Sequence, residues 1–300
     1  MTTLAKICAA AALPSVLGQA GQPMEDHYQL PHHSFQSPVT YDDALPHWFM
    51  SGATMPSKKS VILVPGILGR AGMFFNKQPI LTSDFNLETE FSFQAPQRPH
   101  NPDLNLDQKF AFWYVHTNTT AAFSETVVMN EGSWETGLEK MGWDTVGFKN
   151  DFDGLGVVFS NSPGGGPRQQ VSMITNDGIK PVREADIFKQ QTKPVRFRST
   201  DRLNKIVLKV RVKDASAAVE VWMNNQQAHR FEIHSDLLHK GGYIGFTAWT
   251  GKAGDQAMGA APGTQADRVE IYYVRAHNMD LSTAGEELDV RFLNVLFSLF

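Results

Sequence analysis

Small polar residues follow an apolar stretch that contains two glycines. Residues 152–159 read FDGLGVVF, and residues 160–166 continue as SNSPGGG. The first segment is typical of a buried β-strand entered through a glycine turn, and the second of a polar loop at its end. Small hydroxyl and amide groups at the mouth of a rigid strand are suited to holding a ligand. This loop is therefore the first candidate site.

Other residue types with chemical potential show no catalytic spacing. The sequence contains no G-x-S-x-G, G-x-x-x-x-G-K-[ST] or H-E-x-x-H pattern. His229, His234 and His239 recur every five residues, a spacing that alternates faces on a strand, so we expect no shared metal. Glu88 and Glu90 have the i, i+2 spacing that a sandwich glycosidase needs for paired carboxylates. They lie on the polar side of their segment without a further signature, so a hydrolase is kept only as an alternative.

The elements that must position these residues are short strands. Residues 21–58 carry five prolines, and we expect them to be irregular. Further on, apolar and polar residues alternate in short segments with frequent turn signals, and no long amphipathic helix is predicted. The pattern predicts an all-β fold, a two-sheet antiparallel β-sandwich in one domain. The predicted strands are residues 85–93, 109–115, 154–159, 170–175, 205–213, 217–223, 226–233, 243–249 and 269–274.

One predicted strand carries a row of cations. Lys205, Lys209, Arg211 and Lys213 alternate with apolar residues in this segment. Such a row could contact a nucleic acid or an anionic membrane. No aromatic residue is interleaved with these charges, and the formal net charge of the chain is -4. We therefore interpret the row as a solvated sheet face and expect no nucleic-acid partner.

The two ends of the chain read differently from the middle. Residues 1–20 place Lys6 before a short apolar stretch and small residues, which is typical of a secretory signal peptide, with a buried helix as the alternative. Cys8, the only cysteine, lies in this segment, so the mature chain would have no disulfide. Residues 279–300 end in the apolar run VRFLNVLFSLF. This segment could dock on the domain, or begin a stalk or membrane segment and so give membrane association.

Five stretches, in this order, resemble the L-type (leguminous-type) lectin domain of cargo receptors that cycle between the endoplasmic reticulum and the Golgi. The most specific are FDGLGVVF at 152–159, close to the family's W-x-G-L-G-V-F-F-D, and GYIGFTAWTG at 242–251, close to G-Y-F-G-F-S-A-x-T-G. The others are HSF at 33–35 with LPHWF at 45–49, FNLETEF at 85–91 and FAFWY at 110–114. The resemblance covers residues 32–278. It implies a concanavalin-like jelly roll that binds high-mannose glycans through calcium.

The resemblance also implies where a sugar would bind. The family's sugar-binding aspartate falls on Gln108, since Asp107 lies one residue out of register and would point to the other face. The loop after residue 159 offers Asn161 for the family's asparagine. The closing T-G-G loop falls on residues 250–253, TGKA, in which a lysine replaces a glycine. The implied carbohydrate-binding residues are Gln108, Asn161, Gly251, Lys252 and Ala253.

The calcium ligands of the family are largely replaced in this chain. Its strand-ending aspartate falls on Ser160, and the later aspartate could be Asp177 or Asp186. Calcium takes six to eight oxygen ligands and prefers carboxylates among them. The remaining weak candidates for metal ligands are Ser160, Asn161 and Asp186. We therefore expect weak or no calcium binding and no other cofactor.

Together these features predict a non-enzymatic, lectin-like cargo receptor in the lumen or membrane of the endoplasmic reticulum and Golgi. It would bind high-mannose glycoprotein cargo through a degenerate, calcium-independent site. Two alternatives stay open. One is a lumenal protein-interaction module without glycan binding, and the other is a sandwich glycosidase.

Overall fold

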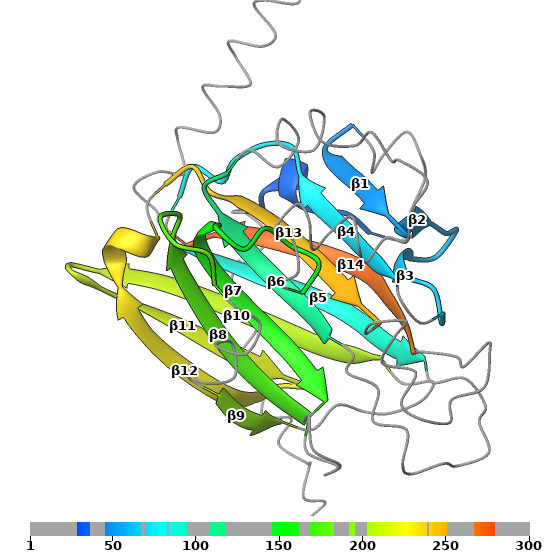
Figure 1. Ribbon diagram of the computed structural model, residues 1–300. Helices are drawn as coiled ribbons and strands as arrows, with labels where there is room; N and C mark the ends of the chain where they lie inside the picture. The colour runs from blue at the N-terminus through cyan, green and yellow to red at the C-terminus, as the bar shows by residue number, and fades with distance from the viewer. Residues whose placement is uncertain are drawn as a thin grey trace, which may run out of the picture.

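The computed structural model describes residues 29–36, 46–67, 70–82, 84–94, 109–117, 146–161, 169–182, 192–195, 203–238, 240–250 and 267–279. These residues form a sandwich of two antiparallel seven-stranded sheets (Figure 1). The predicted all-β, two-sheet antiparallel class is therefore confirmed. In the described ranges, two short 3-10 helices, η2 (Pro31–His33) and η3 (Ser235–Leu237), accompany the sheets.

We call the two layers the front sheet and the back sheet. The front sheet has the order β1 (Trp48–Gly52), β4 (Ala71–Asn76), β13 (Tyr243–Trp249), β6 (Lys109–Val115), β7 (Asp153–Asn161), β8 (Gln169–Asp177) and β9 (Thr192–Val195). The back sheet has the order β12 (Gln226–His234), β11 (Ser216–Met223), β10 (Asn204–Lys213), β5 (Phe85–Gln94), β14 (Arg268–Asn278), β3 (Val61–Val64) and β2 (Met55–Pro56). Figure 1 shows β6, β7, β8 and β13 lying side by side in front of the back sheet.

The hydrophobic core between the sheets follows from the period-two pattern of the strands. In β10, Ile206, Leu208 and Val210 are buried in this core, while the basic residues between them lie on the outer face. Aromatic rings join the two layers. Phe91 of β5 stacks on Phe110 of β6 with ring centroids 4.9 Å apart. An Asn-Asn turn joins the predicted strands β11 and β12, where Asn224 and Asn225 have φ angles of 51° and 68°.

The front sheet is buried on its outer face as well. A second apolar cluster there centres on Trp113, whose ring lies 4.8 Å from the ring of Phe148 and 5.1 Å from that of Phe152. The Trp113 indole N–H donates a hydrogen bond of 2.8 Å to the Thr247 hydroxyl. Burial on both faces explains why β6 reads as a continuous apolar run and lies in the middle of its sheet. It also explains why we did not predict β4, since AGMFFN has no alternation.

The glycines of the two strongest motifs are steric requirements of this sheet. A Cβ added at Gly156 would lie 2.6 Å from the Trp113 ring, and one added at Gly245 would overlap the Phe75 ring. A Cβ at Gly242 would likewise overlap the ring of Tyr114. The glycines therefore lie at the positions where large aromatic rings of neighbouring strands pack against the backbone. It is a requirement of the fold and not of a ligand.

Substitution of Gly245 by alanine tests this account. We expect Gly245→Ala to lower the free energy of unfolding by about 1–3 kcal/mol through overpacking against Phe75. In the double variant with Phe75→Leu, the smaller side chain leaves room, so the two effects should couple by about 1 kcal/mol or more. Urea unfolding of the four proteins measures both quantities. Strictly additive effects would contradict the account.

The N-terminal described segment is attached to both sheets. The backbone N–H of Leu30 donates to Ala276 O at 2.8 Å and that of Phe35 to Val274 O at 2.9 Å, and Asn76 donates to His32 O at 2.6 Å. His33, in η2, is buried as a result. Burial, with smaller contributions from His32 and His47, lowers the pKa of His33 from 6.5 to about 3.

This pKa makes stability depend on pH. The unfolded chain takes up a proton at His33 below pH 6.5, whereas the folded chain does so only near pH 3. The contribution is therefore present above pH 6.5 and is lost as the pH falls, by about 3 kcal/mol between pH 7 and pH 4. We expect the free energy of unfolding of His33→Gln to fall less than that of the parent over this interval. The carboxylates titrate in both proteins, so their contribution cancels in the comparison. Urea unfolding at several pH values measures both free energies, and an equal decrease in the two proteins would refute the assignment.

Candidate functional site

Most residues that the resemblance assigns to the site lie outside the described residues. These are Gln108, Gly251, Lys252, Ala253 and Asp186. Asn161 is described by its backbone, as the last residue of β7, where it pairs with Gln169 of β8. Ser160 is fully described. The binding roles of these residues therefore stay predictions. The described residues next to them in the chain show at which end of the front sheet the segments that carry them start.

Four neighbouring strands bring these flanking residues together at one end of the front sheet. Lys109, which follows Gln108, pairs with Trp249 of β13 on one side and with Ser160 of β7 on the other. Ser160 pairs in turn with Gln170 of β8. Each of these four residues has a chain neighbour in the core between the sheets: Ala248, Phe110, Phe159 and Val171. Successive strand residues alternate in direction, so Trp249, Lys109, Ser160 and Gln170 form one row on the outer face, which we call the polar row.

The polar row contains an unusual pair of buried groups. The Lys109 side chain has no exposed surface, and its ammonium lies 4.9 Å from the centroid of the Trp249 ring. An indole face at this distance attracts a cation. Ser160 is 1% exposed, and its hydroxyl has no hydrogen-bond partner in the described part of the chain. A buried hydroxyl without a partner carries a desolvation cost, which a bound polar group would remove.

Thr250 fixes the point at which the predicted closing loop begins. Its hydroxyl donates to Ile67 O at 2.8 Å and accepts from the Arg70 backbone N–H at 2.8 Å, while its own N–H donates to Arg70 O at 3.0 Å. The threonine is fully buried. It therefore anchors the chain ahead of Gly251 and uses its hydroxyl on protein. Sequence reasoning gave this threonine no role, although its place in the T-G motif was a signal.

The described residues do not fit a calcium site. No group of three His, Cys, Asp or Glu residues among them could hold a metal ion. At the strand end, Ser160 offers one neutral oxygen, and Lys109 is paired directly beside it. No step of binding is therefore assigned to calcium.

Asp177, one of the two aspartates considered as a later ligand, does not lie beside Ser160. Ser160 pairs with Gln170, whereas Asp177 pairs with Asp153 at the opposite end of β7 and β8. Seven residues of strand separate the two ends by about 24 Å. Asp177 instead accepts a hydrogen bond from the Ile179 N–H at 3.0 Å.

The paired carboxylates considered for a glycosidase lie on the outer face of the back sheet. Glu88 binds the Lys205 ammonium at 2.7 Å and accepts from the Tyr273 hydroxyl at 2.6 Å. Burial raises the pKa of Glu88, but the bonds from Lys205 and Tyr273 outweigh it and leave the pKa lowered. A general acid needs a raised pKa. The geometry therefore gives Glu88 a structural ion pair.

The histidines at five-residue intervals do not converge where they are described. His229 packs edge-on against Phe231 at 4.4 Å, and His234 contacts Asp236 at 3.1 Å. His239 lies outside the described residues.

The basic row of β10 is paired with neighbouring strands. Lys205 binds Glu88, and Arg211 donates to Asn86 Oδ1 at 3.1 Å. Lys209 lies over the Trp222 ring at 5.0 Å. No aromatic residue interleaves with the cations along β10 itself, but the fold brings Trp222 alongside from β11. The expected solvated sheet face therefore includes an aromatic side chain that a single strand could not reveal.

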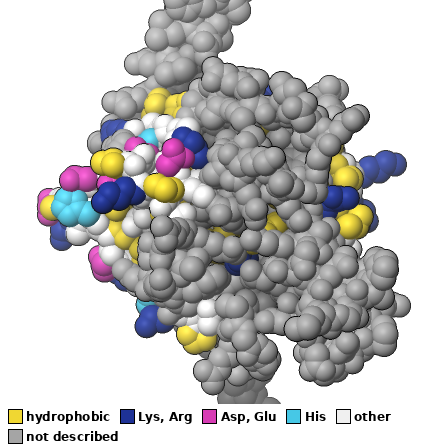
Figure 2. All heavy atoms as spheres, in the orientation of Figure 1, with side chains coloured by type: hydrophobic (Ala, Val, Ile, Leu, Met, Phe, Trp, Pro, Cys, Tyr) yellow, Lys and Arg dark blue, Asp and Glu magenta, His cyan; other side chains and the backbone are white. Residues whose placement is uncertain are grey.

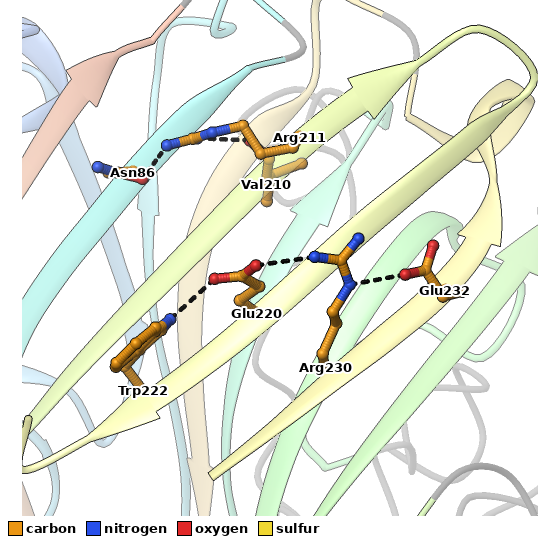
Figure 3. A network of polar contacts seen from close by, with 7 residues as sticks. All are labelled: Asn86, Val210, Arg211, Glu220, Trp222, Arg230 and Glu232. Atoms are coloured by element: carbon orange, nitrogen blue, oxygen red, sulfur yellow. Dashed lines mark hydrogen bonds and ion pairs between the residues drawn. The ribbon is translucent and has the colours of Figure 1, made fainter. Parts of the chain in front are cut away.

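The neighbouring strands continue this network toward the sheet edge (Figure 3). Glu220 accepts from the Trp222 indole N–H at 3.0 Å and from Arg230 at 3.1 Å, and Arg230 also donates to Glu232 at 2.7 Å. Around η3, acidic and basic side chains are intermixed on the visible surface (Figure 2). Opposite charges on adjacent strands stabilise a sheet and neutralise its field.

The ends of the chain remain outside this description. Residues 1–20 and 280–300, with the predicted signal peptide and apolar segment, are not among the described residues. Within the described ranges, no helix is long and apolar enough to span a bilayer.

Comparison with known proteins places this sandwich in a family. Residues 26–260 match the legume-like lectin family, whereas no curated protein gives a significant sequence match. The potassium-bound carbohydrate recognition domain of Emp46p superimposes with a TM-score of 0.60 at 15% identity, covering 83% of this chain and 98% of that one. The corresponding domain of Emp47p gives 0.59 at 15% identity, covering 84% and 97%.

The exoplasmic/lumenal domain of VIP36, in a Ca2+/Man2-bound form, gives a TM-score of 0.59 at 17% identity and covers 85% of this chain and 90% of that one. At these identities the structural likeness shows a shared fold. The family match extends over most of the chain and includes β1 to β13, among them the strands of the polar row. The chain therefore belongs to the legume-like lectin family.

Proposed function

We propose that this protein is a non-enzymatic, lectin-like cargo receptor of the early secretory pathway that binds high-mannose glycoproteins without calcium. The observation that carries the proposal is the polar row. It places a buried hydroxyl without a described partner, a buried ammonium and an indole at the end of the front sheet where the predicted loops begin. Family membership and the VIP36 domain, which was solved with Man2 and with Man3GlcNAc, support a mannose-containing ligand. The lumenal origin of that domain supports the compartment.

The chemistry of the predicted residues suits a neutral sugar. Sugar hydroxyls donate and accept hydrogen bonds, and the amides of Gln108 and Asn161 can do both. Gly251 lets the closing loop approach a ligand closely, while Lys252 adds a donor. These neutral and cationic groups hydrogen-bond a sugar directly, and none of them is a charged metal ligand. Calcium-independent binding follows from this set.

A glycan array probed with the full chain tests the proposal. We expect binding to high-mannose glycans that is unchanged by EGTA, because the described end of the front sheet offers no metal site. We expect Gln108→Ala to weaken binding by about tenfold, the value of one hydrogen bond to a polar ligand. Loss of the signal in EGTA would refute calcium independence. Absence of any glycan signal would refute the lectin function.

Calorimetric titration with calcium gives an independent test. We expect no binding isotherm for the full chain at neutral pH in the micromolar range, since the family's strand-ending aspartate falls on the neutral Ser160. A calcium chelator titrated in the same buffer serves as the positive control. A micromolar dissociation constant would contradict the assignment.

A second candidate function is a lumenal protein-interaction module. It is favoured by the replacement of the family's strand-ending aspartate by Ser160, because a chain without the family's charged calcium ligands could have lost sugar binding altogether. Glycoprotein cargo that still binds after enzymatic deglycosylation would support this candidate over the first. Release of reducing sugar from mannose-rich substrates would instead support the glycosidase alternative.

A further inference from the structure

The outermost strand of the back sheet differs from the other sheet edges. In the described part of the chain, the two sheets end in β1, β9, β12 and β2. β2 has two residues and contains Pro56, β9 has four and contains Pro194, and β1 has five and ends at Gly52. Short length and proline both hinder the addition of a further strand. β12 has nine residues without proline or glycine, so it is the edge best suited to accept one.

The regular part of β12 has an apolar face and a charged face. It runs from residue 229 to residue 234, beyond a bulge at which the register with β11 shifts. Phe231 belongs to the core between the sheets, and the partly exposed Ile233 packs against this core. Arg230 and Glu232 alternate with them on the outer face, with 52% and 58% of their side chains exposed. A strand added at this edge would cover Ile233 and meet both charges.

Arg230 can bind a further carboxylate in addition to its two neighbours. Its Nε donates to Glu232 at 2.7 Å and its Nη1 donates to Glu220 at 3.1 Å (Figure 3). These bonds use two of the five N–H donors of a guanidinium. A carboxylate on a facing strand can therefore bind Arg230 while both bonds persist.

The order of charges along β12 is self-complementary about one residue. Side chains alternate between faces, so two identical antiparallel strands keep their faces matched only if the two-fold axis passes beside a residue. An axis at Arg230 or at Glu232 would place that charge opposite itself. An axis at Phe231 instead places Arg230 of each copy opposite Glu232 of the other. Axes farther along would run the pairing into the bulge or into η3.

We propose that β12 pairs with β12 of a second copy of this chain in an antiparallel ladder about a two-fold axis at Phe231. The two back sheets then form one continuous sheet. Because this axis stands perpendicular to the joined sheet, both front sheets lie on the same side of it. A ladder of about five residues is a small interface, so the dimer dissociates in the micromolar range. The inference goes beyond the proposed function and does not depend on glycan binding.

Charge reversal tests both the pairing and its register. In Arg230→Glu each new glutamate faces Glu232 of the other copy, and in Glu232→Arg each new arginine faces Arg230. Sedimentation velocity of the full chain should show a concentration-dependent dimer. Each variant should dissociate at least about tenfold more readily, since like charges directly opposite destabilise a ladder. Lys213→Glu is the matched control. It reverses an exposed charge on β10, which β11 separates from β12, and should dimerise as the parent does.

An equimolar mixture of the two reversal variants separates pairing across the axis from effects within one chain. In a mixed dimer, both glutamates of the first variant face arginines of the second. We expect the mixture to dimerise within about tenfold of the parent affinity, although each variant alone is a folded monomer by thermal unfolding. The inference is overturned if the parent stays monomeric up to roughly 0.1 mM. Association that survives in both single variants, or a mixture that stays monomeric, would overturn it as well.

Discussion

The contact of aromatic rings with glycine in the middle of the front sheet is the constraint on which the rest of the structure depends. Trp113 lies on Gly156, Phe75 on Gly245 and Tyr114 on Gly242. These contacts set the register of β6, β7, β13 and β4, because a shift by one residue would place a ring on a side chain. The same register places Trp249, Lys109 and Ser160 side by side at the end of those strands. The geometry of the site is thus a consequence of packing elsewhere in the sheet.

The geometry of the candidate site comes from four paired strands and from Thr250, whose hydroxyl donates to Ile67 O and accepts from the Arg70 backbone N–H. The row contains a buried ammonium over an indole ring and a buried hydroxyl. On the back sheet, Lys205 and Arg230 bind carboxylates on neighbouring strands.

The fold was predictable from the sequence because its main signals are local. Alternation in β10 distinguished its buried face from its solvated face, and residues 109–115 were predicted as the strand that is β6. The features that were missed depend on neighbours across the sheet. Trp222 reaches Lys209 only after β11 pairs with β10, and the burial of Lys109 follows only from the pairing of β6 with β13 and β7. The choice between Asp177 and Asp186 was open for the same reason, since strand pairing decides which end of a sheet a residue occupies, and Asp177 lies at the end opposite Ser160.

The central claim is that sugar binds beside the polar row with no metal ion. A crystal structure of the full chain, grown with a mannose trisaccharide in the presence of EGTA, measures this directly. The account predicts sugar density at the end of β13, β6 and β7, within hydrogen-bonding reach of the chain around Gln108 and Asn161, and no ion beside Lys109. Sugar that appears only when calcium is supplied, or that binds on another face of the sandwich, would contradict it.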